Sequence, residues 1–271
     1  SLNRLTQNDL QQFYARLKKS GRKRLTEQYG AGLSDRMVRM CHAVCRSALE
    51  RAVRDDLLRT NPAIGCKLPP KKAKEMQVLD REELQKFLIQ AQADGYYELF
   101  LLDLCTGLRR GELIALQWED LNFETGVLTV NKQAYTVNGE LQIIPPKTKA
   151  SMRKLVLPPA VQAVLREYKK TVDSRWMFPS PVKADRPITP GVARRRLQTI
   201  LERADCKRVR FHDLRHTFAT LALQNGVDVK TVSSMLGHYS AGFTLDTYAH
   251  VTTDAQLKAA QTMGNILSRA V

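Results

Sequence analysis

The sequence predicts a mainly α-helical protein with a small antiparallel β-sheet, divided into two domains. Apolar residues recur at helical spacing along most of the chain, and the period falls to about two only within 126–158. A proline- and lysine-rich stretch at 67–77 interrupts the helical pattern and is typical of a linker. We therefore expect a helical domain over 1–66 and a larger domain, which contains the sheet, over 78–271.

Two helices are predicted in the first domain. Thr6 has the character of an N-cap, with Asp9 at the capping-box position, and Ser34 is expected to begin a long helix over 35–57. Spacing of three and four residues places nine apolar side chains of that helix on one face. This predicted stripe comprises Met37, Val38, Cys41, Val44, Cys45, Ala48, Leu49, Ala52 and Val53.

The second domain begins with a helix that Asp80 is expected to cap, and further helices follow. The segments 126–137, 140–152 and 153–158 then predict a three-stranded antiparallel sheet, with a turn at Asn138-Gly139. After Pro158 the pattern is helical to the end of the chain. Its final stretch, "DAQLKAAQTMGNILSRAV", predicts an amphipathic helix over 254–271.

Lysine and arginine outnumber aspartate and glutamate by 43 to 27, for a formal net charge of +16. This excess predicts a polyanionic partner, either nucleic acid or an acidic membrane surface. Residues 1–66 carry 13 basic and 6 acidic side chains, and 67–77 carry 4 and 1. Two basic bodies joined by a basic strap suit a clamp around a DNA duplex better than a flat membrane contact.

Other classes of protein are disfavoured by the composition. No apolar run approaches the roughly 20 residues of a membrane span, and the polar start "SLNRLTQNDL" does not resemble a signal peptide. The chain also lacks an initiator methionine, so we expect a fragment of a longer protein. Its five cysteines show no C-x-x-C spacing, which predicts reduced, mostly buried thiols in a cytosol.

The stretch "FHDLRHTFAT" places His212, Arg215 and His216 on one face of a helix. Three interpretations follow. Histidines four residues apart can bind zinc, although a neighbouring guanidinium would repel the metal. The histidines can instead be structural, or they can serve with the arginine in a phosphate site, since guanidinium offers paired donors to phosphate oxygens.

Further donors stand near predicted turns in "TGLRRGEL", "PKTKASMR" and "LGHYSAGFTLDTYAHV". Together these residue types suit phosphoryl transfer at a diester. Arginines can clamp the phosphate, a lysine can protonate the leaving oxygen, and a tyrosine hydroxyl can attack. This chemistry requires no metal and no other cofactor, and the sequence contains no Walker loop, G-x-S-x-G motif or acidic ligand cluster.

The order T-G-L-R-x-x-E-L, hairpin lysine, H-x-x-R, L-G-H and T-x-x-Y-x-H resembles the tyrosine recombinase (phage integrase) family over essentially the whole chain. "NPAIGCKLPPKK" and "LGHYSAGFTLDTY" look most like integrases of conjugative transposons from Gram-positive bacteria. The resemblance implies a C-shaped clamp, built from a helical core-binding domain and an α/β tyrosine-recombinase catalytic domain. It also implies site-specific strand exchange that moves a mobile element.

The resemblance further implies a role for each matching residue. Tyr248 would be the nucleophile and form a 3′-phosphotyrosine, while Arg109 and Arg215 would hold the scissile phosphate. Lys147 would be the general acid, with Lys149 as a substitute two residues later.

The remaining motif residues would complete the site. His212 and His238 would contact the phosphate, and His212 would be a candidate to handle the tyrosine proton. Glu112 would orient the first arginine from one turn away. On this interpretation His216 and His250 are structural.

The implied partners are double-stranded attachment sites, held by a homo-tetramer on two duplexes that passes through a Holliday junction. The helix at 254–271 would either pack within its own protomer or dock on a neighbouring one, and an accessory excision factor would bias direction. The protein would associate with the bacterial nucleoid. Side chains expected to face DNA, some of them on the helix at 193–203, are Arg36, Arg39, Arg46, Lys71, Lys72, Lys149, Arg194 and Arg195.

Two alternatives stay open on the sequence. A type IB topoisomerase-like enzyme would use the same chemistry to relax DNA. A non-catalytic DNA-binding protein is the second alternative, because "HTFATLALQNGVDVKTVSSMLGHYS" reads as helix, Asn-Gly turn and helix, like a helix-turn-helix.

Overall fold

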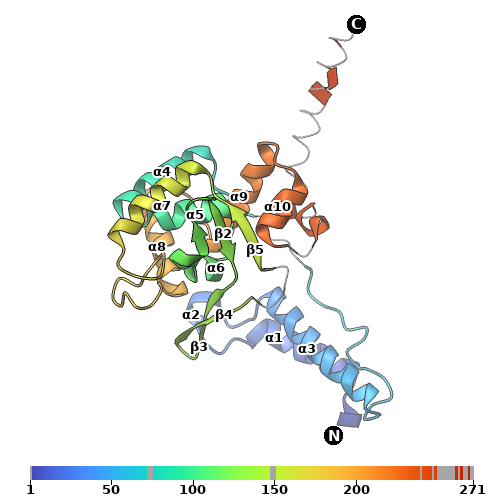
Figure 1. The fold of residues 1–271 in the computed structure, drawn as a ribbon. Coiled ribbons are helices and arrows are strands. Elements are labelled where there is room, and N and C mark those ends of the chain that lie inside the picture. The colour runs from blue at the N-terminus through green and yellow to red at the C-terminus, as the bar shows by residue number, and fades with distance from the viewer. Residues whose placement is uncertain are drawn as a thin grey trace. The chain divides into compact units, whose positions relative to one another are not determined.

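The computed structural model describes residues 2–71, 76–146, 151–238, 240–245, 247–248, 260–261, 263–264 and 268. The chain separates into two compact units, Ser1–Glu75 and Met76–Val271 (Figure 1). Their division falls within 67–77, the stretch predicted as a linker. Each unit has buried apolar clusters of its own.

The regular structure of unit 1, within residues 2–71, is helical. Thr6 caps the first long helix as predicted, because its hydroxyl accepts a hydrogen bond from the Asp9 N–H and the Asp9 carboxylate accepts one from the Thr6 N–H. Ser34 caps the second through the Met37 N–H. The elements are η1 (Leu2–Arg4), α1 (Gln7–Ser20), α2 (Thr26–Tyr29) and α3 (Asp35–Arg54).

Helix α3 buries a narrower stripe than its sequence predicted. Val38 and Leu49 pack with Leu10 and Tyr14 of α1 in the buried cluster of unit 1. Val44, by contrast, is 68% exposed although it lies on the predicted apolar face. The prediction was too wide because α1 is the one long helix that packs on α3 within this unit, and one helix covers only a strip of its neighbour.

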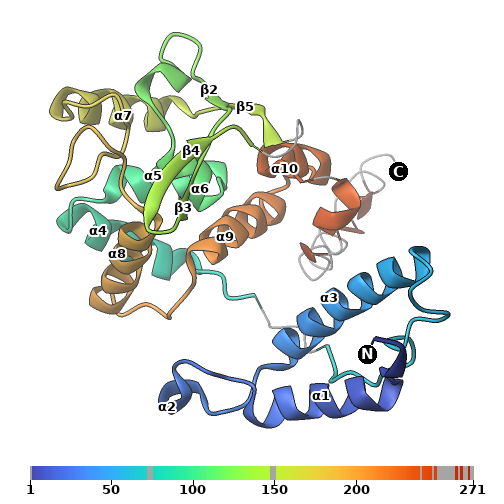
Figure 2. The same cartoon turned by 90° about the horizontal axis from the view of Figure 1, so that it is seen from below.

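Unit 2 is built around α5 (Tyr97–Thr106), which packs against α4, α7 and α9 (Figures 1 and 2). A helix that is apolar on nearly all sides is expected to be central, and the sequence "YELFLLDLCT" has this character. The other helical elements are α4 (Arg81–Ala93), α6 (Arg110–Ile114), η2 (Trp118–Asp120), α7 (Pro159–Thr171), α8 (Pro190–Arg203), α9 (Phe211–Gln224) and α10 (Val229–Leu236).

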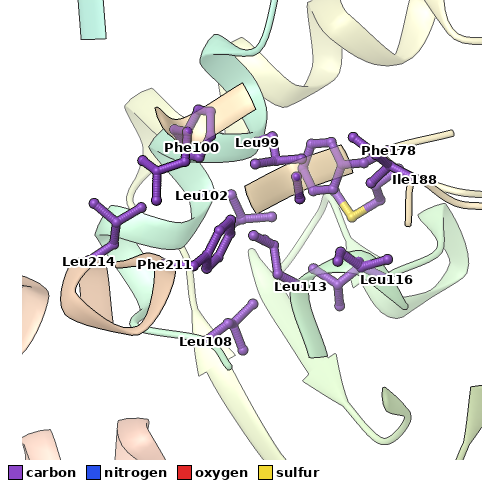
Figure 3. Close-up of a cluster of buried hydrophobic side chains, with 14 of the residues drawn as sticks. Leu99, Phe100, Leu102, Leu108, Leu113, Leu116, Phe178, Ile188, Phe211 and Leu214 are labelled. Atoms are coloured by element: carbon purple, nitrogen blue, oxygen red, sulfur yellow. The ribbon is translucent and has the colours of Figure 1, made fainter. Parts of the chain in front are cut away.

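The largest buried cluster of the chain lies between α5 and its neighbours (Figure 3). Phe211 and Leu214 of α9 point into this cluster beside Leu102 of α5. Leu108 and Leu113, which flank the start of α6, pack into the same cluster. Both segments that carry predicted phosphate-binding arginines are thus anchored to one rigid core.

The β-structure differs from the predicted three-stranded sheet. A three-stranded antiparallel sheet is present, but its order is β1 (Leu121–Asn122), β2 (Val127–Val130) and β5 (Arg153–Val156). The predicted strand 126–137 is divided, and its second half forms a separate hairpin of β3 (Gln133–Val137) and β4 (Glu140–Ile144). The turn of this hairpin is Asn138-Gly139, as predicted, and both residues have positive φ.

Lys132 explains why the predicted strand breaks. Its Nζ donates to both carboxylate oxygens of Asp120, at 2.8 and 3.0 Å, and to the Gln117 side chain at 2.9 Å. Asp120 is 5% exposed, so this contact draws the lysine inward at the point where β2 would otherwise continue. Alternation along the sequence does not reveal such a long-range ion pair.

All five cysteines are free thiols, as expected, but each is half-buried rather than buried. No helix in the described parts of the chain is long and apolar enough to cross a membrane. Of the predicted C-terminal helix, 254–271, only residues 260–261, 263–264 and 268 are described, and the rest lies outside the described residues.

Candidate active site

Arg109 and Glu112 are in direct contact at the start of α6. The Glu112 carboxylate accepts a hydrogen bond from the Arg109 backbone N–H at 2.9 Å and one from its Nη1 at 2.8 Å. Arg109 Nη2 donates to the Gly237 carbonyl at 3.1 Å. Glu112 is 1% exposed, whereas the side chain of Arg109 is 38% exposed. The carboxylate therefore holds the guanidinium in place while part of it stays open to solvent.

Arg215 is the second predicted arginine, and it is 2% exposed. Its Nη1 donates to the Gly107 carbonyl at 2.8 Å, and its Nη2 donates to the Leu236 carbonyl at 2.6 Å. Gly107 ends α5 with a φ of +61°, and a Cβ there would meet Phe218 at 2.4 Å. The Thr-Gly turn thus ends α5 before Arg109 and also brings the Gly107 carbonyl to Arg215.

The C-terminus of α10 gathers three arginines. The Met235 carbonyl accepts from Arg153 Nε at 2.6 Å, and the next two carbonyls accept from Arg215 and Arg109. The last carbonyls of a helix have no partner within the helix and carry the negative end of its dipole. Three guanidiniums satisfy them here, so the "LG" of the L-G-H motif organises the site through its backbone.

Arg153 is a site residue that the sequence interpretation missed. It stands at the start of β5, and its Nη2 donates to Glu112 Oε2 at 2.9 Å. With 7% of its side chain exposed, it supports Glu112 from the side opposite Arg109. The available signal was its place in "PKTKASMR", where the sequence interpretation singled out the lysines.

The charges in this cluster are unbalanced. Burial by itself would raise the pKa of Glu112, but Arg153 and Arg109 outweigh it and the pKa is lowered. Burial and Arg109 lower the pKa of Arg215 to about 10, so it keeps its charge at neutral pH. Asp103 is fully buried, and neither of its oxygens has a hydrogen-bond partner among the described residues. Burial raises the pKa of this carboxyl well above its usual range.

The one ionised carboxylate of the cluster, Glu112, therefore faces three guanidiniums, and this arrangement attracts an anion.

Two predicted histidines border the cluster. His238 follows α10, and its Nδ1 lies 2.8 Å from Thr244 Oγ1. Burial, then Arg215 and Arg109, lower its pKa to about 4. His212 is exposed at the start of α9, and desolvation followed by Arg215 lowers its pKa as well.

Tyr248 is 1% exposed and packs with Phe218, Val232 and Leu236. Its Oη lies 2.7 Å from Nδ1 of His216, a residue that the sequence interpretation considered structural and separate from the nucleophile. Burial raises the pKa of Tyr248 to about 12, although Arg215 acts in the opposite direction. The structure thus places the predicted nucleophile within the electrostatic reach of a predicted phosphate-binding arginine.

Several predicted residues lie outside the described residues, namely Lys72, Lys147, Lys149 and His250. Their predicted roles are neither supported nor contradicted by the contacts above. The next basic residue along the chain is Arg153 at the start of β5, which donates to the Met235 carbonyl and to Glu112.

The predicted DNA-facing arginines are mostly exposed. Arg36 and Arg46 of α3 are exposed, as are Lys71 and the α8 residues Arg194 and Arg195. Arg39 differs, because its Nη1 donates to the Pro69 carbonyl at 2.8 Å and so serves a contact within unit 1.

Arg110 adds an unpredicted charge beside this set. It is half-buried, and desolvation together with Arg194 lowers its pKa. Among the described residues neither Arg110 nor Arg194 has an ion-pair partner, and such close like charges favour a phosphate-rich ligand.

The zinc interpretation of His212 and His216 finds no support in the geometry. Their rings meet edge to face with centroids 4.9 Å apart, and His216 directs Nδ1 to a tyrosine. No group of three or more histidine, cysteine or acidic side chains in the described residues is arranged to hold a metal ion. The geometry instead suits a singly charged phosphodiester and a hydroxyl nucleophile.

Comparison with known proteins is decisive for the family. The model of the phage integrase family matches residues 77–255, about two thirds of the chain. The chain belongs to the phage integrase family. This integrase is 27% identical to the ICEBs1 integrase of Bacillus subtilis over 272 residues, which cover 96% of the chain and 73% of that relative. It is 32% identical to tyrosine recombinase XerA of Pyrococcus furiosus over 216 residues, 78% of the chain and 67% of XerA.

Solved structures show the same fold. The Tn1549 transposon integrase, solved in complex with a circular intermediate DNA, superposes with a TM-score of 0.79 and 22% identity over 96% of this chain and 86% of that one. A lambda integrase tetramer bound to a Holliday junction gives a TM-score of 0.63 and 17% identity over 88% and 66% of the two chains. The predicted fold class, mainly α-helical with small antiparallel sheets and a tyrosine-recombinase catalytic domain, is confirmed.

The family membership also settles the class of reaction. This integrase is a site-specific DNA recombinase that breaks and rejoins DNA strands. Neither alternative, the type IB topoisomerase-like enzyme or the non-catalytic helix-turn-helix protein, gains support from these relatives. The helix-turn-helix pattern corresponds to α9 and α10, which supply Arg215 and the carbonyls on which the three arginines converge.

Proposed function

We propose that this integrase moves a conjugative mobile element by exchanging strands between double-stranded attachment sites, through a 3′-phosphotyrosine formed on Tyr248. The observation that carries the proposal is the α10 terminus, where Arg109, Arg153 and Arg215 converge on three successive carbonyls. Tyr248 packs against the same helix, beside Leu236. A phosphate at this cluster would meet both the positive charge and the hydroxyl that chemistry at a diester requires.

In the proposed reaction, Arg109 and Arg215 bind the non-bridging oxygens of the scissile phosphate, and His212 and His238 donate further hydrogen bonds. Tyr248 attacks phosphorus, and the 5′ oxygen leaves with a proton from Lys147. Glu112 and Arg153 keep the exposed Arg109 in its binding orientation. Because the energy of the broken bond is stored in the phosphotyrosine, a 5′ hydroxyl from the partner strand can reverse the step without ATP.

The DNA contacts are proposed to come from both units. Arg36 and Arg46 of α3 and Arg194 and Arg195 of α8 are exposed, and Arg110 lies beside Arg194. Contacts of this kind neutralise phosphates and fix the register of the protein without reading sequence. The two units are proposed to close on the duplex as a C-shaped clamp, with Lys71 and Lys72 in the strap between them.

The proposed assembly is a homo-tetramer on two duplexes that passes through a Holliday junction, with residues 254–271 docked on a neighbouring protomer. The lambda integrase tetramer on a Holliday junction supports this assembly by analogy. An accessory excision factor is proposed to set direction, and the protein is proposed to act at the nucleoid in the bacterial cytoplasm.

A covalent-capture experiment tests the nucleophile. Nicked suicide duplexes with a randomised sequence are incubated with the full chain in the absence of divalent metal, and adducts are isolated on a denaturing gel. The captured strands are then sequenced. We expect an adduct for the wild type and for Tyr29→Phe, whose tyrosine is exposed in unit 1, and none for Tyr248→Phe. An adduct that persists in Tyr248→Phe, or tight DNA binding without any adduct, would overturn the proposal.

A further inference from the structure

Among the described residues, one imidazole lies in hydrogen-bond contact with the hydroxyl of Tyr248. This imidazole is His216, at 2.7 Å through Nδ1, and not His212, to which the family resemblance assigned the proton. The two histidines are one helical turn apart on α9, and their rings meet edge to face with centroids 4.9 Å apart. His212 is exposed at the start of the helix, whereas His216 is half-buried.

The pKa values of the two groups indicate which of them carries a proton. Burial and the neighbouring His212 lower the pKa of His216 to about 4, and burial raises that of Tyr248 to about 12. At neutral pH the imidazole is therefore uncharged and the phenol keeps its proton. In the tautomer of His216 that carries its proton on Nε2, Nδ1 accepts the hydrogen bond from Tyr248 Oη–H, and this is the tautomer that proton transfer requires.

We propose that His216 is a catalytic residue that accepts the proton of Tyr248 when the tyrosine attacks the scissile phosphate. This inference rests on the proposed function and deepens it. As the Oη–P bond forms, the Oη–H bond breaks and an Nδ1–H bond forms on His216. The bond between phosphorus and the 5′ oxygen breaks, and that oxygen takes a proton from the general acid.

The reverse step balances in the same way. When a 5′ hydroxyl attacks the phosphotyrosine, the Oη–P bond breaks and Oη takes back the proton that His216 has held. The weak basicity of the free imidazole suits this role, since a protonated His216 returns its proton readily. Oη also becomes far more acidic as it bonds to phosphorus, so a weak base is sufficient during attack.

Bound DNA should raise the pKa of His216 and so make it a stronger base. Among the described residues, the charged and titratable groups near His216 come from its own helix, from the N-cap of that helix and from the segment after α10. They are His212, Asp213, Arg215, Arg210, His238 and Tyr248. Arg215 and Arg210 oppose a proton on His216, whereas Asp213 favours it. A phosphate on Arg215 offsets part of that positive charge and so raises the affinity of His216 for the proton.

The test separates proton removal from leaving-group protonation. The captured suicide duplex is synthesised with sulfur in place of the bridging 5′ oxygen at the cut, because a thiolate leaves without a proton. Single-turnover cleavage is measured for the wild type, His216→Asn and Lys147→Ala on both substrates. We expect Lys147→Ala to recover on sulfur. His216→Asn should stay slow on both, by about 100-fold, since the asparagine can hold the hydroxyl but cannot take its proton.

A pH series gives a second readout that a purely structural role would not produce. The wild-type rate on the sulfur substrate should become constant above the pKa that His216 has in the DNA complex, because the base is then deprotonated. In His216→Asn the rate should rise about tenfold per pH unit, since attack then depends on spontaneous ionisation of the tyrosine. Recovery of His216→Asn on sulfur, or a wild-type rate on both substrates, would overturn the inference.

Folding is controlled by the unfolding temperature and by DNA affinity. Because His216 is half-buried, a substitution there can disturb folding, so His216→Gln serves as a second variant. Cleavage rates are compared only among variants that unfold at the wild-type temperature. The capture experiment keeps the two proposals apart. A tyrosine-dependent adduct formed at full rate by His216→Asn contradicts only the role of His216, whereas an adduct in Tyr248→Phe contradicts the proposed nucleophile itself.

Discussion

The two units each contain a histidine–tyrosine pair with a buried tyrosine, and the pairs differ in the groups that surround them. In unit 1, His42 Nδ1 lies 3.3 Å from Tyr14 Oη, and in unit 2 the equivalent distance between His216 and Tyr248 is 2.7 Å. Burial lowers the pKa of both histidines and raises that of both tyrosines. A histidine–tyrosine contact is therefore not by itself a catalytic feature.

The two tyrosines differ in the ionisable groups that surround them. Tyr14 lies among thiols, where Cys45, Cys66 and Cys41 add to the upward shift of its pKa caused by burial. Tyr248 lies within reach of the Arg215 guanidinium, which acts against that shift. A nucleophilic tyrosine needs a neighbouring anion site, and in the described structure the pair of unit 2 has the arginine cluster beside it.

The largest expected effect comes from removing each hydroxyl in turn. Tyr248→Phe should reduce adduct formation by about 10⁴-fold or more, because no other group replaces the nucleophile. Tyr14→Phe should leave the cleavage rate of the folded protein within about twofold. Quantified adducts on the suicide duplex, with unfolding temperatures for both variants, measure the difference. A comparable loss in Tyr14→Phe would show that the first pair also acts in the reaction.

Arg215→Lys tests whether the anion site distinguishes the second pair. Lysine keeps the charge but loses the fixed geometry that reaches the carbonyls of Gly107 and Leu236 together. We expect about a 10²- to 10³-fold loss in the single-turnover cleavage rate, the range for removing one donor from a preorganised site. The matched control is Arg46→Lys at an exposed position of α3, for which the loss in cleavage rate should be less than about tenfold.

Two glycines with positive φ, one in each unit, extend the comparison from side chains to the backbone. Gly107 has a φ of +61°, and an added Cβ would collide with Phe218 at 2.4 Å, whereas Gly30 of unit 1 has a φ of +73° and open space around it. Gly107→Ala combines backbone strain with this collision and should cost about 3 kcal/mol or more in the free energy of unfolding, whereas Gly30→Ala, with a ψ of 169°, is strained by the backbone alone and should cost about 1–2 kcal/mol. Urea unfolding of each variant measures both, and equal losses would contradict the collision.

Asp103 gives an effect on stability alone, with a pH dependence of defined sign. Its pKa is raised in the folded protein, so it favours folding below its unfolded pKa of about 3.9, and this contribution is lost as the pH rises toward the folded value. Asp103→Asn cannot ionise. Its unfolding free energy relative to the wild type should thus grow between pH 4 and pH 8, by at most about 1.4 kcal/mol per unit. Urea titrations at several pH values measure it, and a constant difference would mean that Asp103 is ionised throughout.

Local patterns in the sequence were sufficient for the helix starts and for the candidate residues. Thr6, Ser34 and Asp80 cap their helices as predicted, because a cap depends on atoms within three residues. The motif order also indicated the family that the comparisons confirm, and the structure brings Arg109, Arg215 and Glu112 close to the α10 terminus.

Tertiary structure alone decided how those residues are held. Arg153 reaches Met235 across 82 positions of the chain and Arg109 reaches Gly237 across 128, distances at which periodicity carries no information. The same holds for Lys132, whose ion pair divides the predicted strand, and for Val44, whose exposure depends on how little of α3 its neighbour covers. His212 and His216 share one helical face in the sequence. Which of them meets Tyr248 is decided by packing, since the tyrosine approaches from a segment more than 30 residues further along the chain.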